Sequence, residues 1–173
     1  MTLRLARTTL ASMATVLCLV ASAHGQTRPD AAPTARTASG DWNTGCSGEA
    51  AAKVCDAVQS LVDNASHEER IRVGVAKQKA TGAYGVQIKT PLGLRLDSGA
   101  VLRFSEAAGD AIVDIKFNRC LADGCYAERP LSAAEYAKVR AAGKMDLIVL
   151  DLASKPIIVG LSVKGLKAAL DRL

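Results

Sequence analysis

The chain has 173 residues, of which 49% are hydrophobic and 23% are charged. Its formal net charge of +5 comes from basic residues interspersed with acidic ones, and it holds only one tryptophan, three tyrosines and two phenylalanines. Dispersed charge and few aromatic side chains argue against a nucleic-acid partner, because such a partner needs a basic patch and groups that stack on bases.

The first 23 residues have the features of a signal peptide. Arg4 and Arg7 form a short basic head, an apolar run follows from residue 10 to residue 20, and Ala21 and Ala23 are the small residues that a signal peptidase requires. The run is too short for a stable membrane span. We therefore expect cleavage after Ala23, export, and no transmembrane span in the mature chain.

A linker and one domain are predicted after the signal. Residues 24–40 contain Pro29 and Pro33 among small and polar residues, with no apolar side chain larger than alanine. Such a segment cannot offset the entropy of ordering by burial, which predicts a disordered linker. From residue 41 to residue 173 the composition becomes globular, and this length suits a single domain with its own core.

The domain is predicted to consist mainly of strands. Alternating apolar and polar residues indicate half-buried antiparallel strands, with turns at glycine, proline and aspartate between them. Residues 147–150 are continuously apolar, which predicts a central strand covered on both faces. The expected strands are 54–62, 71–76, 84–89, 94–96, 101–104, 113–118, 145–150 and 157–161.

Two short helices are expected among these strands. Ser132 and Glu135 have the spacing of a capping box, and Gly143 is available just past the end of that helix. A second helix is predicted from residue 166 to the end of the chain, where leucines and an alanine fall on one face. The predicted fold class is therefore mainly β, α+β at most, with an antiparallel β-sandwich-like domain and two short helices.

Four cysteines remain when Cys18 leaves with the signal peptide: Cys46, Cys55, Cys120 and Cys125. An even number in an exported domain predicts disulfides, although four cysteines allow three pairings. The Asp-Gly pair at residues 123–124 predicts a hairpin with a four-residue loop, 121–124, that places Cys120 opposite Cys125. Cys46 would then pair with Cys55.

The same cysteines do not favour a metal site or a redox catalyst. Their spacings, C-x8-C and C-x4-C, are neither a repeated zinc knuckle nor the C-x-x-C of a thiol oxidoreductase. Beyond His24 in the linker, the only histidine is His67, which lies in a polar stretch rather than in a predicted pocket. We predict no metal, no cofactor and no catalytic residues, so the protein is expected not to be an enzyme.

The ordered set of motifs resembles the invasion-associated locus B family. The set runs from Asp41-Trp42 to the closing LSVKGLKAAL at 161–170, and it includes Cys46, Cys55, Gln59, TPLGLRL at 90–96, Gly99, FNRC at 117–120 and GCYA at 124–127. Val163 and Leu166 depart from the leucine and aromatic residue that are typical of the family. The resemblance implies an exported bacterial protein with paired cysteines, in a family named after a member linked to host-cell invasion, and it brings no catalytic residues.

These observations together predict a noncatalytic envelope-associated or binding protein that contributes to host-cell interaction. Its expected location is the periplasm, with the outer membrane or the medium as further destinations. Candidate partner contacts are Trp42, Arg119 and Tyr126, the last two because they flank the cysteine hairpin. The alternative is a periplasmic accessory factor for the folding or assembly of envelope proteins; the sequence specifies neither the partner nor the oligomeric state.

Overall fold

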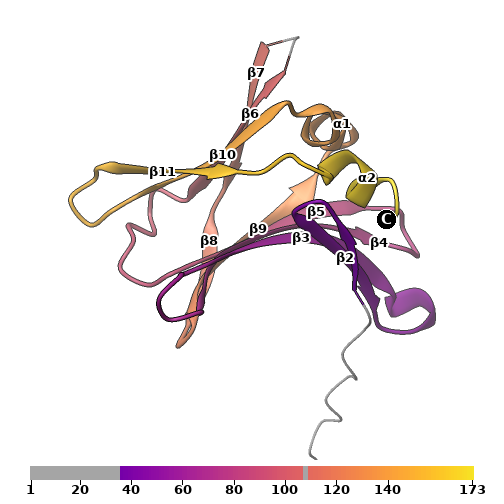
Figure 1. The fold of residues 1–173 in the computed structure, drawn as a ribbon, viewed down its shortest axis with the longest axis horizontal. Coiled ribbons are helices and arrows are strands. Elements are labelled where there is room, and N and C mark those ends of the chain that lie inside the picture. The colour runs from indigo at the N-terminus through magenta and orange to yellow at the C-terminus, as the bar shows by residue number, and fades with distance from the viewer. Residues whose placement is uncertain (1–35, 107–108) are drawn as a thin grey trace, which may run out of the picture. The chain divides into compact units, whose positions relative to one another are not determined.

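A computed structural model describes residues 36–106 and 109–173, which form two antiparallel sheets and two α-helices (Figure 1). The large sheet has seven strands in the order β1-β2-β3-β4-β5-β9-β8, and the small sheet has four in the order β11-β10-β6-β7. The predicted class, mainly β and sandwich-like with two short helices, is confirmed. The strands are β1 (Thr37–Ser39), β2 (Trp42–Ser47), β3 (Val54–Val62), β4 (Glu69–Gln78), β5 (Tyr84–Thr90), β6 (Ala100–Glu106), β7 (Gly109–Ile115), β8 (Phe117–Leu121), β9 (Gly124–Leu131), β10 (Lys144–Leu150) and β11 (Pro156–Leu161).

The core lies between the two sheets. Alternation with period two sends one set of side chains inward from each strand, such as Val73 and Val75 from β4. The small sheet contributes Leu102 and Phe104 from β6 in the same way. Burial of these apolar side chains, at roughly 1.5–3 kcal/mol each, is the main force that holds the sheets together.

The chain passes from one sheet to the other at Lys116, between β7 and β8. The sequence predicts a single strand over 113–118, but the structure ends β7 at Ile115 and starts β8 at Phe117. One continuous alternation of apolar and polar residues thus spans two strands that belong to different sheets. Period-two patterns give the face of each residue but not the sheet to which a strand belongs, which is why this break was not predicted.

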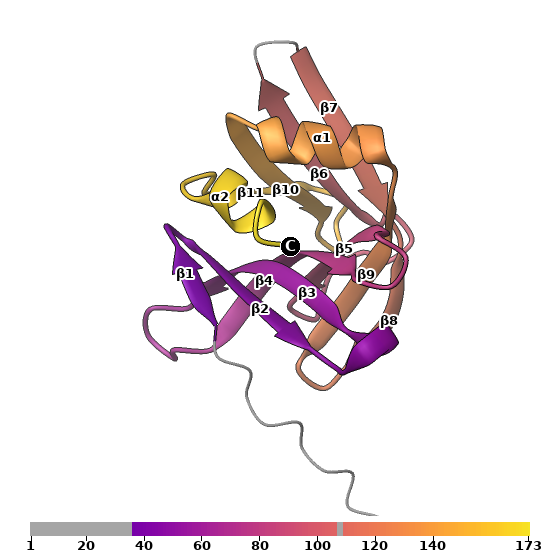
Figure 2. The ribbon, with the colours of Figure 1, turned by 90° about the vertical axis from the view of Figure 1, so that its right-hand side faces the viewer.

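The two helices, α1 (Ala133–Ala141) and α2 (Leu166–Leu170), cover one end of the space between the sheets, here called the closed end (Figure 2). The predicted capping box is present, since the Glu135 backbone N–H donates to Ser132 Oγ and the Ser132 N–H donates to Glu135 Oε2. Tyr136 of α1 stacks on Tyr84 of β5 with ring centroids 3.6 Å apart. This stacking fastens α1 to the large sheet, and α2 packs against β1, β2 and β3 of the same sheet.

Three local predictions need correction. Residues 37–39, expected in the disordered linker, form β1, because backbone pairing to β2 needs no large apolar side chain. Residues 94–96 make only an isolated bridge, Leu94 to Asp151, instead of a strand. β10 is central in its sheet as predicted, but it is not covered on both faces, because Ile148 on its outer face is only half-buried.

The predicted signal peptide and linker residues 24–35 lie outside the described residues. Within residues 36–106 and 109–173, no helix is long and apolar enough to cross a membrane.

Candidate functional site

The β8–β9 hairpin presents a group of hydrogen-bonded polar side chains beside a pocket. Its two strands pair from Phe117 to the tip, and Cys120 faces Cys125 with a disulfide between them and Cα atoms 4.0 Å apart. The loop holds only Ala122 and Asp123, because the ladder continues to a Leu121–Gly124 pair; the predicted four-residue loop is therefore too long by two residues.

Gly124 is the residue that this tight turn requires. Its φ of 144° is a backbone conformation that L side chains rarely adopt, and a Cβ there would collide with the Thr90 carbonyl oxygen of β5. The glycine lets the hairpin tip lie against the end of β5. The disulfide and this close approach together fix the tip relative to the large sheet.

Arg119 and Tyr126, both predicted partner contacts, lie opposite each other on this hairpin. The Arg119 guanidinium lies over the Tyr126 ring, 4.8 Å from its centroid, and Nη1 donates to Glu128 Oε1 at 2.6 Å. The Tyr126 hydroxyl donates to Asp123 Oδ2 at 2.7 Å. Both side chains are thus held in place while they stay accessible, Arg119 exposed and Tyr126 half-buried.

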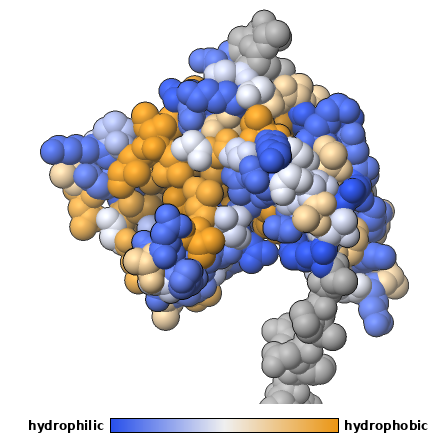
Figure 3. All heavy atoms as spheres, in the orientation of Figure 1, coloured by the Kyte–Doolittle hydropathy of each residue, from blue (hydrophilic) through white to orange (hydrophobic). Residues whose placement is uncertain are grey.

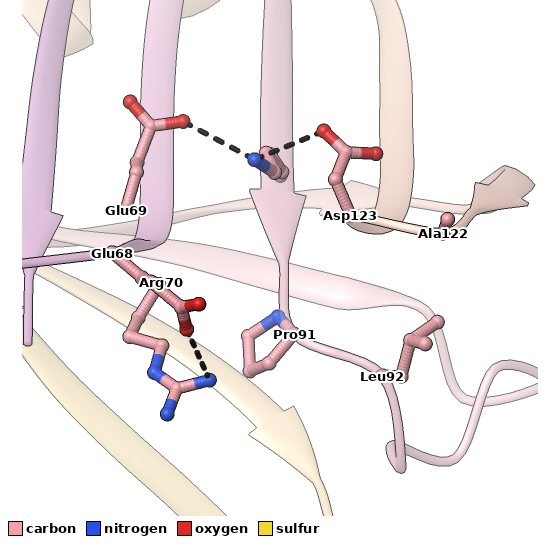
Figure 4. Close-up of a pocket in the computed structure, with 8 residues that line it drawn as sticks. Glu68, Glu69, Arg70, Pro91, Leu92, Ala122 and Asp123 are labelled. Carbon is pink, nitrogen blue, oxygen red and sulfur yellow. Dashed lines mark hydrogen bonds and ion pairs between the residues drawn. The ribbon is translucent and has the colours of Figure 1, made fainter. Parts of the chain in front are cut away.

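A pocket of about 480 Å³ lies beside the hairpin tip, where β4 begins and β5 ends (Figure 4). Lys89 reaches into it between two carboxylates, with Nζ 3.5 Å from Glu69 Oε1 and 3.1 Å from Asp123 Oδ2. Leu92 adds an apolar wall and is 56% exposed. The lining residues are Glu68, Glu69, Arg70, Lys89, Pro91, Leu92, Ala122 and Asp123.

Hydrogen bonds in this network shift the pKa values of Lys89, Asp123 and Glu128 toward their charged forms. The hydrogen bond with Asp123 raises the pKa of Lys89, and that from Tyr126, aided by Lys89, lowers the pKa of Asp123. Hydrogen bonds from Arg119, Gln87 and Asn118 lower the pKa of Glu128 to about 2. Because its pKa is raised, Lys89 is protonated near neutral pH and is a poor nucleophile or base, so the arrangement suits recognition by charge.

The other predicted residues lie away from this hairpin. Cys46 and Cys55 form the second disulfide across β2 and β3, with Cα atoms 3.9 Å apart. Trp42 is fully buried at the closed end, where its Nε1 donates to the Ser162 carbonyl oxygen at 2.8 Å. The prediction of Trp42 as a partner contact is therefore wrong, because no part of its side chain is accessible.

Sequence reasoning missed Lys89, Glu69 and Leu92. Lys89 occupies an outward position of a predicted strand and Glu69 stands in a polar stretch, so neither has a local signal of function. Only the pairing of β5 with β9 and β4 brings them to the hairpin. In the part of the chain that the structure describes, no group of three or more histidine, cysteine or acidic side chains could hold a metal ion.

Comparisons with known proteins give one consistent family. The family model described as invasion associated locus B (IalB) protein matches residues 42–173. Two invasion protein B homologues of Brucella abortus, from strain 2308 and from biovar 1 strain 9-941, are each 27% identical over 153 residues, covering 88% of this chain and 86% of theirs. The crystal structure of invasion associated protein B from Bartonella henselae has the same fold, with a TM-score of 0.67, 20% identity, and coverage of 80% of this chain and 95% of the other.

Proposed function

Because this chain belongs to the invasion-associated locus B family, we propose that it is an exported, noncatalytic binding protein of the cell envelope that contacts a protein partner through the β8–β9 hairpin. The partner surface consists of the hairpin and the pocket beside it. Arg119 and Tyr126 are its central contacts, and Leu92 and Leu121 are its apolar rim.

The main observation behind this proposal is the preorganised Arg119–Tyr126 pair, which lies next to the exposed residues Leu92 and Leu121. Tyrosine and arginine are enriched among the residues that dominate the energy of protein interfaces. Their side chains are already held by Asp123 and Glu128, which lowers the entropy lost on binding. Leu121 at the tip is 54% exposed and supplies apolar area beside the charges.

The two disulfides support a location outside the cytoplasm, since such bonds persist in oxidising compartments. We place the protein in the periplasm, with release to the outer surface or the medium as a further step. The names of the Brucella and Bartonella relatives refer to invasion, and we extend that role here as a contribution to host-cell contact.

Site-specific photocrosslinking in intact cells tests this proposal. A photoreactive residue replaces Leu121 in one variant and Ile112 in the control. Ile112 is a similarly exposed apolar residue, at 60%, but it lies on β7 of the small sheet. We expect Leu121 to capture one or a few defined envelope or host proteins, and Ile112 to capture none of them.

Two outcomes would contradict the proposal. Equal capture at both positions would show that the hairpin is not a specific contact surface. Capture of many unfolded envelope proteins at Leu121 would instead favour the accessory role in folding or assembly.

A further inference from the structure

β11 is an edge strand that is protected only at its first position, by Pro156, and is open to pairing along its other five residues. It is the terminal strand of the small sheet, six residues long, and it pairs with β10 without a bulge. Its sequence, PIIVGL, holds no charged residue. A regular, charge-free edge offers its backbone N–H and C=O groups to another strand, and natural proteins normally avoid such an edge.

The other three sheet edges of the described residues each carry a feature that discourages pairing. β1 has only three residues, and β8 has a register shift and carries Arg119. β7 carries Asp110 and Asp114. β11 has only Pro156 at its first position, so its other five residues form an edge without such a feature.

Apolar side chains are exposed on both faces of β11. Ile157 pairs with the buried Val149 and so faces the large sheet, yet it is 40% exposed. Ile158 points to the opposite face and is 55% exposed. Figure 3 shows hydrophobic surface gathered in this region, on the side where Figure 1 places β10 and β11.

Ile158 also begins an apolar row across the outer face of the small sheet. It pairs with Ile148 of β10, which in turn pairs with Val101 of β6, and both of these are half-buried. The row stops at Asp114 of β7. It is therefore open toward the β11 edge and bounded by charge at the other edge.

We propose that β11 is a self-association surface, on which β11 of a second copy of this chain pairs antiparallel about a two-fold axis at Ile158. This arrangement would join two small sheets into one of eight strands. The row Val101–Ile148–Ile158 would continue into the same row of the second copy, so the two exposed Ile158 side chains would pack against each other. Such an interface is isologous, with the same patch used by both chains.

Charges at the two ends of β11 favour the antiparallel direction. Exposed Lys155 precedes the strand, while at its other end Ser162 Oγ donates to the exposed carboxylate of Asp41 at 2.6 Å. Antiparallel pairing brings Lys155 of each copy toward Asp41 of the other, whereas parallel pairing would bring the two lysines together. Exposed Lys164 near Asp41 weakens this attraction, so the charges orient the strands and add little affinity.

This inference is independent of the proposed function, because β11 does not contribute to the hairpin surface. The first test measures the mass of the full chain, recovered after export, by sedimentation from micromolar to near-millimolar concentration. We expect a reversible monomer–dimer equilibrium. Ile158→Asp should weaken dimerisation at least about tenfold, because a carboxylate would have to be buried against its own copy.

Ile112→Asp is the matched control, since Ile112 is at least as exposed on the same sheet but lies on β7. It should dimerise like the unchanged chain. A chain that stays monomeric throughout the range would overturn the proposal, as would equal weakening by both substitutions. Binding of an extended apolar peptide to β11 by a strictly monomeric chain would assign the edge to a foreign strand and would also overturn it.

A covalent test fixes the register. Directly opposed residues of antiparallel strands have Cα atoms about 4.5–5.5 Å apart, which is within reach of a disulfide. Ile158→Cys should therefore form a disulfide-linked dimer on mild oxidation, and Ile112→Cys should not. Equal crosslinking of the two variants would contradict pairing at Ile158.

Discussion

The closed end and the β8–β9 hairpin use similar residues for opposite purposes. At the closed end Trp42 is fully buried, and the hydroxyl of Tyr136 donates to the Leu170 carbonyl oxygen. On the hairpin, Tyr126 is also hydrogen-bonded, but its ring stays accessible beneath Arg119. The difference teaches that a hydrogen bond alone does not decide the role of an aromatic residue: burial makes Trp42 part of the core, whereas Tyr126 keeps an accessible ring that the proposed function uses for recognition.

The largest change in stability is expected from the loss of Trp42, the buried aromatic residue of the closed end. Trp42→Ala should lower the free energy of unfolding by about 3–5 kcal/mol, because it leaves a cavity and removes one of the two hydrogen bonds that the Ser162 carbonyl accepts, the other coming from Gln59 Nε2. Urea unfolding measures this change. Leu152→Ala, at a residue that is 75% exposed, is the control and should change stability by less than about 0.5 kcal/mol.

Removal of each disulfide compares the β8–β9 hairpin with the other disulfide-linked pair of strands, β2 and β3. Closing the Cys46–Cys55 loop is worth about 2.7 kcal/mol and closing the Cys120–Cys125 loop about 2.2 kcal/mol by chain entropy. Paired alanine substitutions should lower stability by these amounts, with an added packing loss at Cys55 and at Cys125, which are 1% and 2% exposed. Urea unfolding again provides the measurement.

Partner capture should respond differently to the two substitutions. Loss of the Cys120–Cys125 bond should reduce photocrosslinking from Leu121, since the hairpin tip would lose its fixed position. Loss of the Cys46–Cys55 bond should leave capture unchanged at a temperature where the variant stays folded. Equal losses of capture would mean that the hairpin disulfide has no specific role in recognition.

The hairpin and the closed end meet at Glu135, which gives a smaller, pH-dependent effect. A hydrogen bond from Arg129 of β9 and those at Ser132 lower the pKa of Glu135 from 4.5 to about 2. Because this pKa is depressed in the folded state, the stabilisation is fully present above pH 4.5 and is lost as pH falls toward 2. Glu135→Gln should cost about 1–2 kcal/mol at neutral pH and flatten the loss of stability in acid.

Urea unfolding at a series of pH values measures the Glu135 effect. Glu49→Gln is the control, since Glu49 is exposed and makes no ion pair in the part of the chain that the structure describes. Its acid profile should match that of the unchanged chain. An unaltered profile for Glu135→Gln would show that the Arg129 contact does not couple β9 to α1.

The sequence predicted those parts of both regions that depend on neighbours along the chain. The capping box at Ser132, the bounds of β3 and the two cysteine pairings all follow from spacings of ten residues or fewer. The contact of Lys89 with Asp123 was not predictable, because it depends on which strand pairs with β5. The burial of Trp42 likewise depends on Ser162, which is 120 residues away.

The smallest expected effect on stability is also the sharpest test of the comparison. Tyr126→Phe removes only the hydroxyl that donates to Asp123, in a hydrogen bond that solvent screens and that is therefore worth about 1 kcal/mol or less. Stability should therefore change little, but the hydrogen bond that holds the Tyr126 ring and Asp123 together would be lost. We expect photocrosslinking from Leu121 to fall several-fold while the unfolding curve stays nearly the same.

Tyr136→Phe at the closed end, which removes a hydroxyl bonded to Leu170, should show the reverse: a measurable loss of stability and unchanged capture. If both variants lost stability and capture in parallel, recognition would depend simply on the amount of folded protein, and the distinction between the two regions would fail.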